Sequence, residues 1–319
     1  MKKTALLLAF LLLLSACVSC GPTGETEEEH DYDYYAINMN TDFAVQDTLP
    51  DGEGKPAKVI LLLGQSNASG CSINAYLEKA VPAEQYAAYA AGYDNVRINY
   101  CIDNHNRSSG GAFVPVDLSC GANDGFFGPE VGMAEVLSAA FPGETVFILK
   151  FTMSGYSLNH HWLYGFERAS IYQAFLPFVS TYMTYLSEKG YAATNDAVCW
   201  MQGESDTDEW KSGRYLQNLT AFVGFLREDL APFTRAGGFY FIDAGISDGP
   251  YCLPGYPAVN AAKEQFAATS PLHVYFSTID EGLTTLQEPT EAPDLGHYDA
   301  LSELRLGQMF GERIVEIYS

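Results

Sequence analysis

The sequence predicts an α/β protein, a three-layer α/β/α sandwich around a mainly parallel, doubly wound sheet. Short aliphatic or β-branched runs alternate along the chain with longer stretches of helical periodicity, which is typical of strands joined by crossover helices. The composition allows a large buried core, because 47% of the 319 residues are hydrophobic and 13% are aromatic. No internal repeat interrupts the alternation, so we expect one large domain.

The apolar runs give the strands of this sheet and the periodic stretches give its helices. The predicted strands are 59–63, 96–100, 146–151, 197–201 and 239–242, with 274–277 as a further candidate. The predicted helices are 130–141, 171–189, 215–230, 257–268 and 302–317. Ligands of such sheets bind at the carboxyl ends of the strands, so chemically active residues should directly follow the apolar runs.

The first 55 residues precede this domain and have a different character. Lys2 and Lys3 stand before an apolar run, 5–14, that is too short to span a bilayer, so we interpret residues 1–16 as a signal peptide. Leu14-Ser15-Ala16-Cys17 resembles the lipobox of bacterial lipoproteins, which predicts an exported protein whose lipidated Cys17 anchors it on the periplasmic or cell-surface face of a cell-envelope membrane. An ordinary signal peptide cleaved near Ala16 or Ser19 is the alternative. Residues 17–55 would form an acidic tether and N-terminal arm, and residues 56–319 the domain.

Charge and cysteine content limit the partners and cofactors of the chain. The formal net charge is -23, from 40 acidic and 17 basic residues, which argues against nucleic acid as a partner and favours a neutral substrate over a polyanion. Seven cysteines are present, and an odd number of them lies in the domain: Cys71, Cys101, Cys120, Cys199 and Cys252. At least one is therefore unpaired unless it bonds Cys20 or another chain. The domain has no CxxC spacing, so a zinc site has little support.

Three polar turns follow directly after predicted strands. Gly64-Gln65-Ser66-Asn67-Ala68 follows 59–63, and a Ser behind a Gly that permits a sharp turn is well placed as a nucleophile. Thr152-Met153-Ser154-Gly155 follows 146–151, and Gln202-Gly203-Glu204-Ser205-Asp206 follows 197–201. The Gly155 N–H and the Gln202 amide could donate to one anion in the same crevice. Taken alone, each turn is more typical of an ordinary strand-to-helix connection than of a catalytic site.

A fourth polar segment, Asp294-Leu295-Gly296-His297, stands just before the last predicted helix. A carboxylate three residues before a His can accept from one imidazole nitrogen and leave the other nitrogen to take a proton from a Ser hydroxyl. Four such segments at suitable places along one chain together predict a site for nucleophilic catalysis.

These motifs resemble the sialate O-acetylesterase-like branch of the SGNH hydrolases, which includes carbohydrate acetylesterases. The resemblance covers about residues 58–319 and implies the flavodoxin-like SGNH hydrolase fold. It implies Ser66 as nucleophile, His297 as general base and Asp294 as its orienting acid. It also implies an oxyanion hole made of the Ser66 N–H, the Gly155 N–H and the Gln202 side chain. The supporting residues would be Gln65, Asn67, Glu204 and Asp206, with Glu204 bracing its loop or assisting the His.

The function implied by this resemblance is that of a serine esterase. It would remove O-acetyl groups from carbohydrates, such as sialate or other plant or host glycans, through an acetyl-Ser66 intermediate that needs no metal and no organic cofactor. One alternative is a surface glycan-binding lipoprotein that has lost the chemistry. Another is an SGNH lipase or thioesterase that acts on longer acyl chains.

A last candidate feature, His160-His161-Trp162, follows Gly155 by a few residues. Trp162 and His161 could line the sugar pocket, since an indole offers an apolar face to a sugar ring. The alternative is a packed loop aromatic beside solvent-facing imidazoles. A metal site at the two His residues is less favoured than either.

Overall fold

The computed structural model describes residues 32–319. The predicted signal peptide, Cys17 and the first part of the tether therefore lie outside the described residues. The short helix α1 (Tyr32–Tyr35) ends where the chain divides into two units, and the account below concerns residues 35–319.

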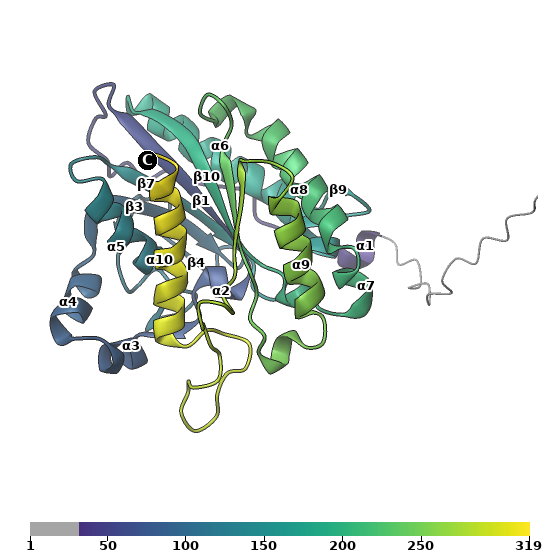
Figure 1. The fold of residues 1–319 in the computed structure, drawn as a ribbon. Helices are drawn as coiled ribbons and strands as arrows, with labels where there is room; N and C mark the ends of the chain where they lie inside the picture. Colours follow the sequence, from purple (N-terminus) through teal and green to yellow (C-terminus); the bar gives the residue numbers. More distant parts are fainter. Residues whose placement is uncertain (1–31) are drawn as a thin grey trace, which may run out of the picture. The chain divides into compact units, whose positions relative to one another are not determined.

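A single large sheet carries the fold (Figure 1). Its parallel strands are, from one edge to the other, β12 (His273–Phe276), β11 (Tyr240–Ala244), β10 (Ala192–Met201), β1 (Pro56–Gly64), β7 (Val146–Thr152) and β3 (Tyr93–Ile102). Two short antiparallel strands, β4 (Arg107–Ser108) and β5 (Val114–Val116), pair with β3. All six predicted strands belong to this sheet, and the mainly parallel arrangement is confirmed.

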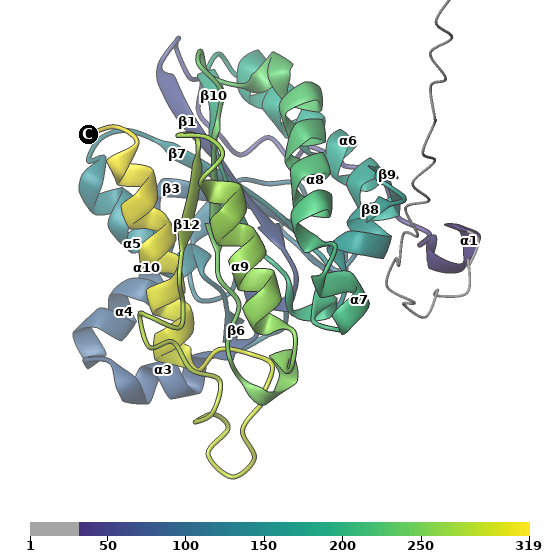
Figure 2. The same cartoon turned by 45° about the vertical axis from the view of Figure 1, so that its right-hand side comes forward.

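Side chains that alternate along β7 separate the two faces of the sheet. Lys150 points to one face, where its ammonium contacts Glu130 at the start of α5 (Glu130–Ala140). Phe151 points to the opposite face, where its ring packs against Phe175 of α6 (Ser170–Glu188). The helices of the sheet therefore lie in two separate layers (Figures 1 and 2).

Register and contacts assign the remaining long helices to these layers. Trp200 lies in the same row as Phe151, and its ring packs against Phe222 of α8 (Tyr215–Asp229). Asp243 shares that row and binds Lys263 of α9 (Tyr256–Ala267). The last helix, α10 (Ala300–Glu316), packs along α5 on the other face. The predicted doubly wound three-layer sandwich is confirmed.

Glycines bring α5 and α10 into backbone contact. A Cβ on Gly132 would overlap the carbonyl of Leu304, and one on Gly307 would overlap the carbonyl of Pro129. This close packing fixes the start of α10, and with it the end of the loop that precedes it, relative to the sheet.

Shorter elements lie in the connections between the strands and the long helices. The helices are α2 (Ser66–Ser69), α3 (Asn74–Ala80), α4 (Ala83–Ala91) and α7 (Glu209–Ser212), a π-helix η1 (Leu158–Trp162), and the 3-10 turns η2 (Glu204–Asp206), η3 (Ala231–Phe233) and η4 (Pro250–Cys252). Two ribbons complete them: β2 (Ser72–Ile73) with β6 (Phe126–Phe127), and β8 (Leu163–Tyr164) with β9 (Glu167–Arg168).

The segment before β1 runs along the body of the domain as an extended arm. The Ala44 carbonyl accepts from the Tyr182 hydroxyl (3.0 Å), and the Gln46 N–H donates to the Gly111 carbonyl (3.0 Å). The five cysteines of residues 35–319 are all free thiols. Among the described helices, none combines the length and apolar character that a bilayer crossing requires.

Candidate active site

Ser66 is the first residue of α2 and directly follows the turn that ends the central strand β1. That turn requires Gly64, because its φ is +147° and a Cβ there would overlap the Met201 carbonyl of β10. The Gln65 N–H donates to the same carbonyl (3.0 Å). Ser66 is thus held at the carboxyl edge of the sheet, with 8% of its surface exposed.

The side chain of Asn67 joins this turn to the segment that carries His297. Its Nδ2 donates to the Gly296 carbonyl (3.2 Å), and its Oδ1 accepts from the Tyr298 N–H (3.2 Å). The residues on both sides of His297 are therefore bound to the neighbour of Ser66. The segment of the predicted base is therefore bound to the turn of the predicted nucleophile at one edge of the sheet.

Glu204 is the third partner of the Asn67 side chain. Its Oε1 accepts from Asn67 Nδ2 (2.7 Å), while its Oε2 is buried with no hydrogen-bond partner among the described residues. Burial raises the pKa of the Glu204 carboxyl, and the bond from Asn67 and the nearby Lys263 and His297 oppose that rise only in part. Through this bond to Asn67, Glu204 lies where a residue that braces the loop is expected.

Asp294 and His297 form a hydrogen-bonded pair within one loop. The His297 Nδ1–H donates to Asp294 Oδ2 (2.6 Å), and the Gly296 N–H donates to Oδ1 (3.1 Å). Partial burial acts to raise the pKa of Asp294, but these bonds outweigh it and the pKa lies below its usual range. Asp294 is therefore ionised at neutral pH and holds the imidazole with Nε2 as the free nitrogen.

The structure corrects the expected role of Gln202. Its side chain is fully buried, and Nε2 donates to Asp206 Oδ2 (2.6 Å), with longer contacts to Gln65 Oε1 and the Tyr156 carbonyl (both 3.3 Å). The Tyr215 hydroxyl donates to Gln202 Oε1 (2.9 Å). Both amide protons thus have acceptors within the protein, so Gln202 organises the floor of the site instead of facing an oxyanion.

Asp206 and Gln65 belong to the same buried floor. Asp206 also accepts from the N–H groups of Leu158 (2.8 Å) and Asn159 (3.2 Å), which ties η2 to η1. Burial raises the pKa of Asp206 to about 6, despite these hydrogen bonds. The Gln65 Oε1 accepts from the Ser205 N–H (3.2 Å). All four predicted supporting residues are therefore present around the Ser66 turn.

Gly155 lies in an exposed turn after β7, with a φ of +79° and open space around its Cα. Its neighbours fix its position: the Ser154 Oγ donates to Ser69 Oγ of α2 (3.2 Å), and the Tyr156 carbonyl contacts Gln202. The Gly155 N–H has no acceptor among residues 32–319. Like the N–H of Ser66 in the first turn of α2, it is available to an anion at this edge.

The prediction that Trp162 lines a sugar pocket is wrong. The indole is fully buried between Trp200, Phe151 and Phe222, because η1 turns it inward onto the aromatic layer above β7 and β10. His161 stays partly exposed beside Tyr156, and its Nδ1 contacts the Ser157 N–H (3.1 Å). Burial and the nearby His160 and Lys211 lower the pKa of His161 to about 4, so it is neutral at pH 7.

A cavity of about 430 Å³ opens directly beside the imidazole of His297. Its walls come from the β2–β6 ribbon and from the loop before α10, and include Ile73, Asn123, Phe126, Glu288, Asp294 and His297. The sequence motifs did not indicate this cavity, because its residues come from segments without a chemical signature. Hereafter it is called the His297 cavity.

A buried ion pair under α2 was also missed. The Lys150 ammonium donates to Glu130 Oε2 (2.7 Å) and to the carbonyls of Ser69 (2.9 Å) and Cys120 (3.0 Å). A Lys inside the otherwise apolar run 146–151 was the signal that could have found it, since a buried ammonium needs a partner. Within residues 32–319, no group of three His, Cys, Asp or Glu side chains could hold a metal ion.

Comparison with known protein families gives one match. A family model described as "Carbohydrate esterase, sialic acid-specific acetylesterase" matches residues 56–316. No curated protein sequence matches the chain.

Solved structures share the fold at low sequence identity. A protein from Arabidopsis thaliana is 17% identical, with 82% of this chain and 98% of that chain covered and a TM-score of 0.59. NanS is 15% identical, with 83% and 98% covered and a TM-score of 0.59. A carbohydrate acetylesterase from Xanthomonas citri is 16% identical, with 81% and 55% covered and a TM-score of 0.50. The predicted SGNH-type α/β fold is confirmed.

Proposed function

The chain belongs to the sialic acid-specific acetylesterase family of carbohydrate esterases, and we propose that it removes O-acetyl groups from carbohydrates through an acetyl-Ser66 intermediate. Membership in this family makes the protein a hydrolase of ester bonds. The covalent intermediate and the residue roles below are the proposal.

The single observation that carries the proposal is the pair of bonds between Asn67 and the residues flanking His297. They bind the segment that carries His297, whose imidazole bonds Asp294, to the residue next to Ser66. Nucleophilic catalysis needs this order of hydroxyl, imidazole and carboxylate.

In the proposed reaction His297 Nε2 takes the Ser66 proton as the hydroxyl oxygen attacks the acetyl carbonyl. The N–H groups of Ser66 and Gly155 stabilise the tetrahedral oxyanion, and one such donor is worth about 3 kcal/mol of barrier. His297 then protonates the leaving sugar oxygen. Water, deprotonated by the same imidazole, releases acetate from Ser66.

The test of this proposal is the variant Ser66→Ala assayed on p-nitrophenyl acetate. Loss of the nucleophile should lower kcat by about 10⁴-fold or more while the melting temperature stays near that of the wild type. Ser138→Ala is the control, because the Ser138 hydroxyl bonds Asn95 at a distance from the site and its loss should not change kcat. Unchanged activity in Ser66→Ala would falsify the assignment.

Two further measurements separate the alternatives. A fluorophosphonate should label Ser66 of the wild type, whereas a glycan-binding protein without the chemistry would not be labelled. Acetyl esters should be hydrolysed faster than octanoyl esters, and the reverse preference would indicate a lipase or thioesterase.

We also propose that lipidated Cys17 holds this activity on a cell-envelope membrane. The support is the order of Lys2 and Lys3, the apolar run and Leu14-Ser15-Ala16-Cys17. Cells expressing the chain should incorporate a fatty-acid label into it, and Cys17→Ser should abolish the label. Equal labelling of both would exclude Cys17 as the acceptor.

A further inference from the structure

The His297 cavity carries an inference about the charge of the sugar, which rests on the proposed function. His297 lines this cavity, and in the proposed reaction the same imidazole protonates the leaving sugar oxygen, so the proposal puts the sugar ring at this cavity. The lining of the cavity therefore bears on which sugars are accepted.

The charges facing this cavity are negative. Asp294 lies in its wall and its pKa is below the usual range, so it is ionised at neutral pH. Glu288 lies in the same wall, where its Oε2 accepts from the Ala300 N–H at the start of α10 (2.7 Å). This bond fixes the second carboxyl group within the wall, and it opposes in part the rise in the Glu288 pKa that burial and the nearby Asp299 cause. None of the lining residues is Lys or Arg.

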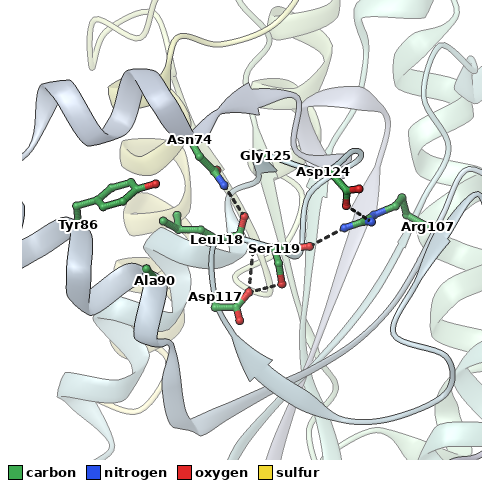
Figure 3. Close-up of a pocket in the computed structure, with 9 residues that line it drawn as sticks. All are labelled: Asn74, Tyr86, Ala90, Arg107, Asp117, Leu118, Ser119, Asp124 and Gly125. Atoms are coloured by element: carbon green, nitrogen blue, oxygen red, sulfur yellow. Dashed lines mark hydrogen bonds and ion pairs between the residues drawn. The ribbon is translucent and has the colours of Figure 1, made fainter.

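Two cations near the site bind other partners, and a third, Lys79 of α3, lies over the Tyr76 ring (5.3 Å) outside the lining of the cavity. Arg107 lies in a neighbouring cavity of about 260 Å³, where Figure 3 shows its guanidinium turned toward Asp124 (2.6 Å) and the Ser119 carbonyl (3.0 Å). Lys211, near the Tyr156 side of the site, binds Asp208 (2.7 Å) and the Ser205 carbonyl (2.9 Å).

The other wall of the His297 cavity suits an uncharged ring. Ile73 and Phe126 present apolar surface, and Asn123 adds an amide that can bond sugar hydroxyls. A pyranose ring has apolar C–H faces and hydroxyl edges, so both kinds of surface have a counterpart.

We infer that the sugar accepted by this chain is uncharged, and that the carboxylates of Asp294 and Glu288 disfavour acetylated sialic acids. A sialic acid brings its own carboxylate, ionised at neutral pH, into a wall of like charge. The family description therefore does not extend to the preferred substrate of this chain.

The experiment compares two substrates that differ in charge and by one methyl group, an O-acetylated sialic acid and its carboxyl methyl ester, and follows acetate release. In the wild type, kcat/KM for the methyl ester should exceed that for the free acid by about tenfold or more, as expected for like charges near a protein surface. Raising the ionic strength should reduce this ratio, because salt screens the repulsion.

Glu288→Gln should lower the ratio of the two kcat/KM values severalfold toward one, because removing one of the two charges raises kcat/KM for the free acid more than for the methyl ester. The Gln carbonyl can still accept from the Ala300 N–H, so the start of α10 is retained. Glu291→Gln is the matched control, since Glu291 is exposed in the same loop and does not line the cavity, and it should not change the ratio.

A wild-type ratio near one, or a preference for the free acid, overturns the inference. If p-nitrophenyl acetate is still hydrolysed through Ser66 in that case, the proposed function stands without it. A chain inactive on all three esters overturns both.

Discussion

Asn67 is the residue on which the geometry of the site depends most. It is buried, and its one amide group contacts Glu204, Gly296 and Tyr298, which come from two segments far from it in sequence. The GQSN motif indicates the position of Asn67 in the sequence, but it does not indicate the partners of its side chain. The motif therefore identified the right residue, while its function as a connector required the structure.

Asn67→Ala should separate positioning from stability. Removing a buried amide with three partners should lower the free energy of unfolding by roughly 1–3 kcal/mol and also lower kcat on p-nitrophenyl acetate by about 10²-fold, because His297 loses its fixed position. Thermal unfolding and steady-state kinetics measure the two effects.

Asn74→Ala provides the comparison for this variant. Asn74 Nδ2 donates to the Leu118 carbonyl (2.9 Å) away from His297, so its loss should affect stability without a comparable fall in kcat. Equal falls in kcat for both variants would show that Asn67 acts on stability alone.

The remaining site residues differ in how far the sequence could place them. Asp294 and His297 lie three residues apart, and this local spacing was enough to predict their hydrogen bond. Gln202 and Trp162 were placed wrongly in role, because the direction of a side chain leaving a strand or a π-helix depends on packing against distant residues. Nothing in the local sequence distinguishes an inward-facing indole from a pocket-lining one.

At the scale of elements, hydrophobic periodicity predicted the sheet and its long helices closely. The runs 146–151 and 197–201 lie within β7 (Val146–Thr152) and β10 (Ala192–Met201), and α5, α6, α8, α9 and α10 start within two residues of their predicted positions. Long, strongly apolar or amphipathic segments carry this signal because their burial is decided by their own pattern.

Short elements near the site were not predicted. Helix α2 is one turn of four residues, and β2 and β6 have two residues each, too few for any periodicity. They form through long-range contacts, such as the Ser72 hydroxyl donating to the Tyr298 carbonyl (2.6 Å). The walls of the His297 cavity come from these elements, so the cavity could not be derived from the sequence.

At the scale of the whole molecule, buried acidic groups link stability to pH. Glu303 of α10 is fully buried, and neither of its carboxyl oxygens has a hydrogen-bond partner among the described residues. Burial, with the nearby charge of Glu130, raises the pKa of Glu303 well above its usual value. The folded chain therefore holds this proton more tightly than the unfolded chain does.

The sign of the pH dependence follows from that difference. The stabilisation is fully present below the ordinary Glu pKa of 4.5 and is lost as pH rises toward the raised pKa of the folded state. Glu303→Gln removes the titrating group. The difference in free energy of unfolding, variant minus wild type, should therefore increase with pH by up to about 1.4 kcal/mol per pH unit.

Denaturant unfolding at several pH values measures this gain. Glu84→Gln, at an exposed position in the first turn of α4, is the control and should follow the wild type at every pH. A constant difference between Glu303→Gln and the wild type from pH 5 to 8 would contradict the expected sign.

The short spacing between Asp294 and His297 has a mechanical consequence. His297 and Asp294 lie on the same four-residue segment, so a displacement of that segment keeps the hydrogen bond between them. What such a displacement changes is the distance from the His297 imidazole to the Ser66 hydroxyl. The two hydrogen bonds of the Asn67 amide hold the segment in place and thereby set this distance. Substitutions at Asn67 can therefore change the rate of the reaction while the hydrogen bond between Asp294 and His297 is kept.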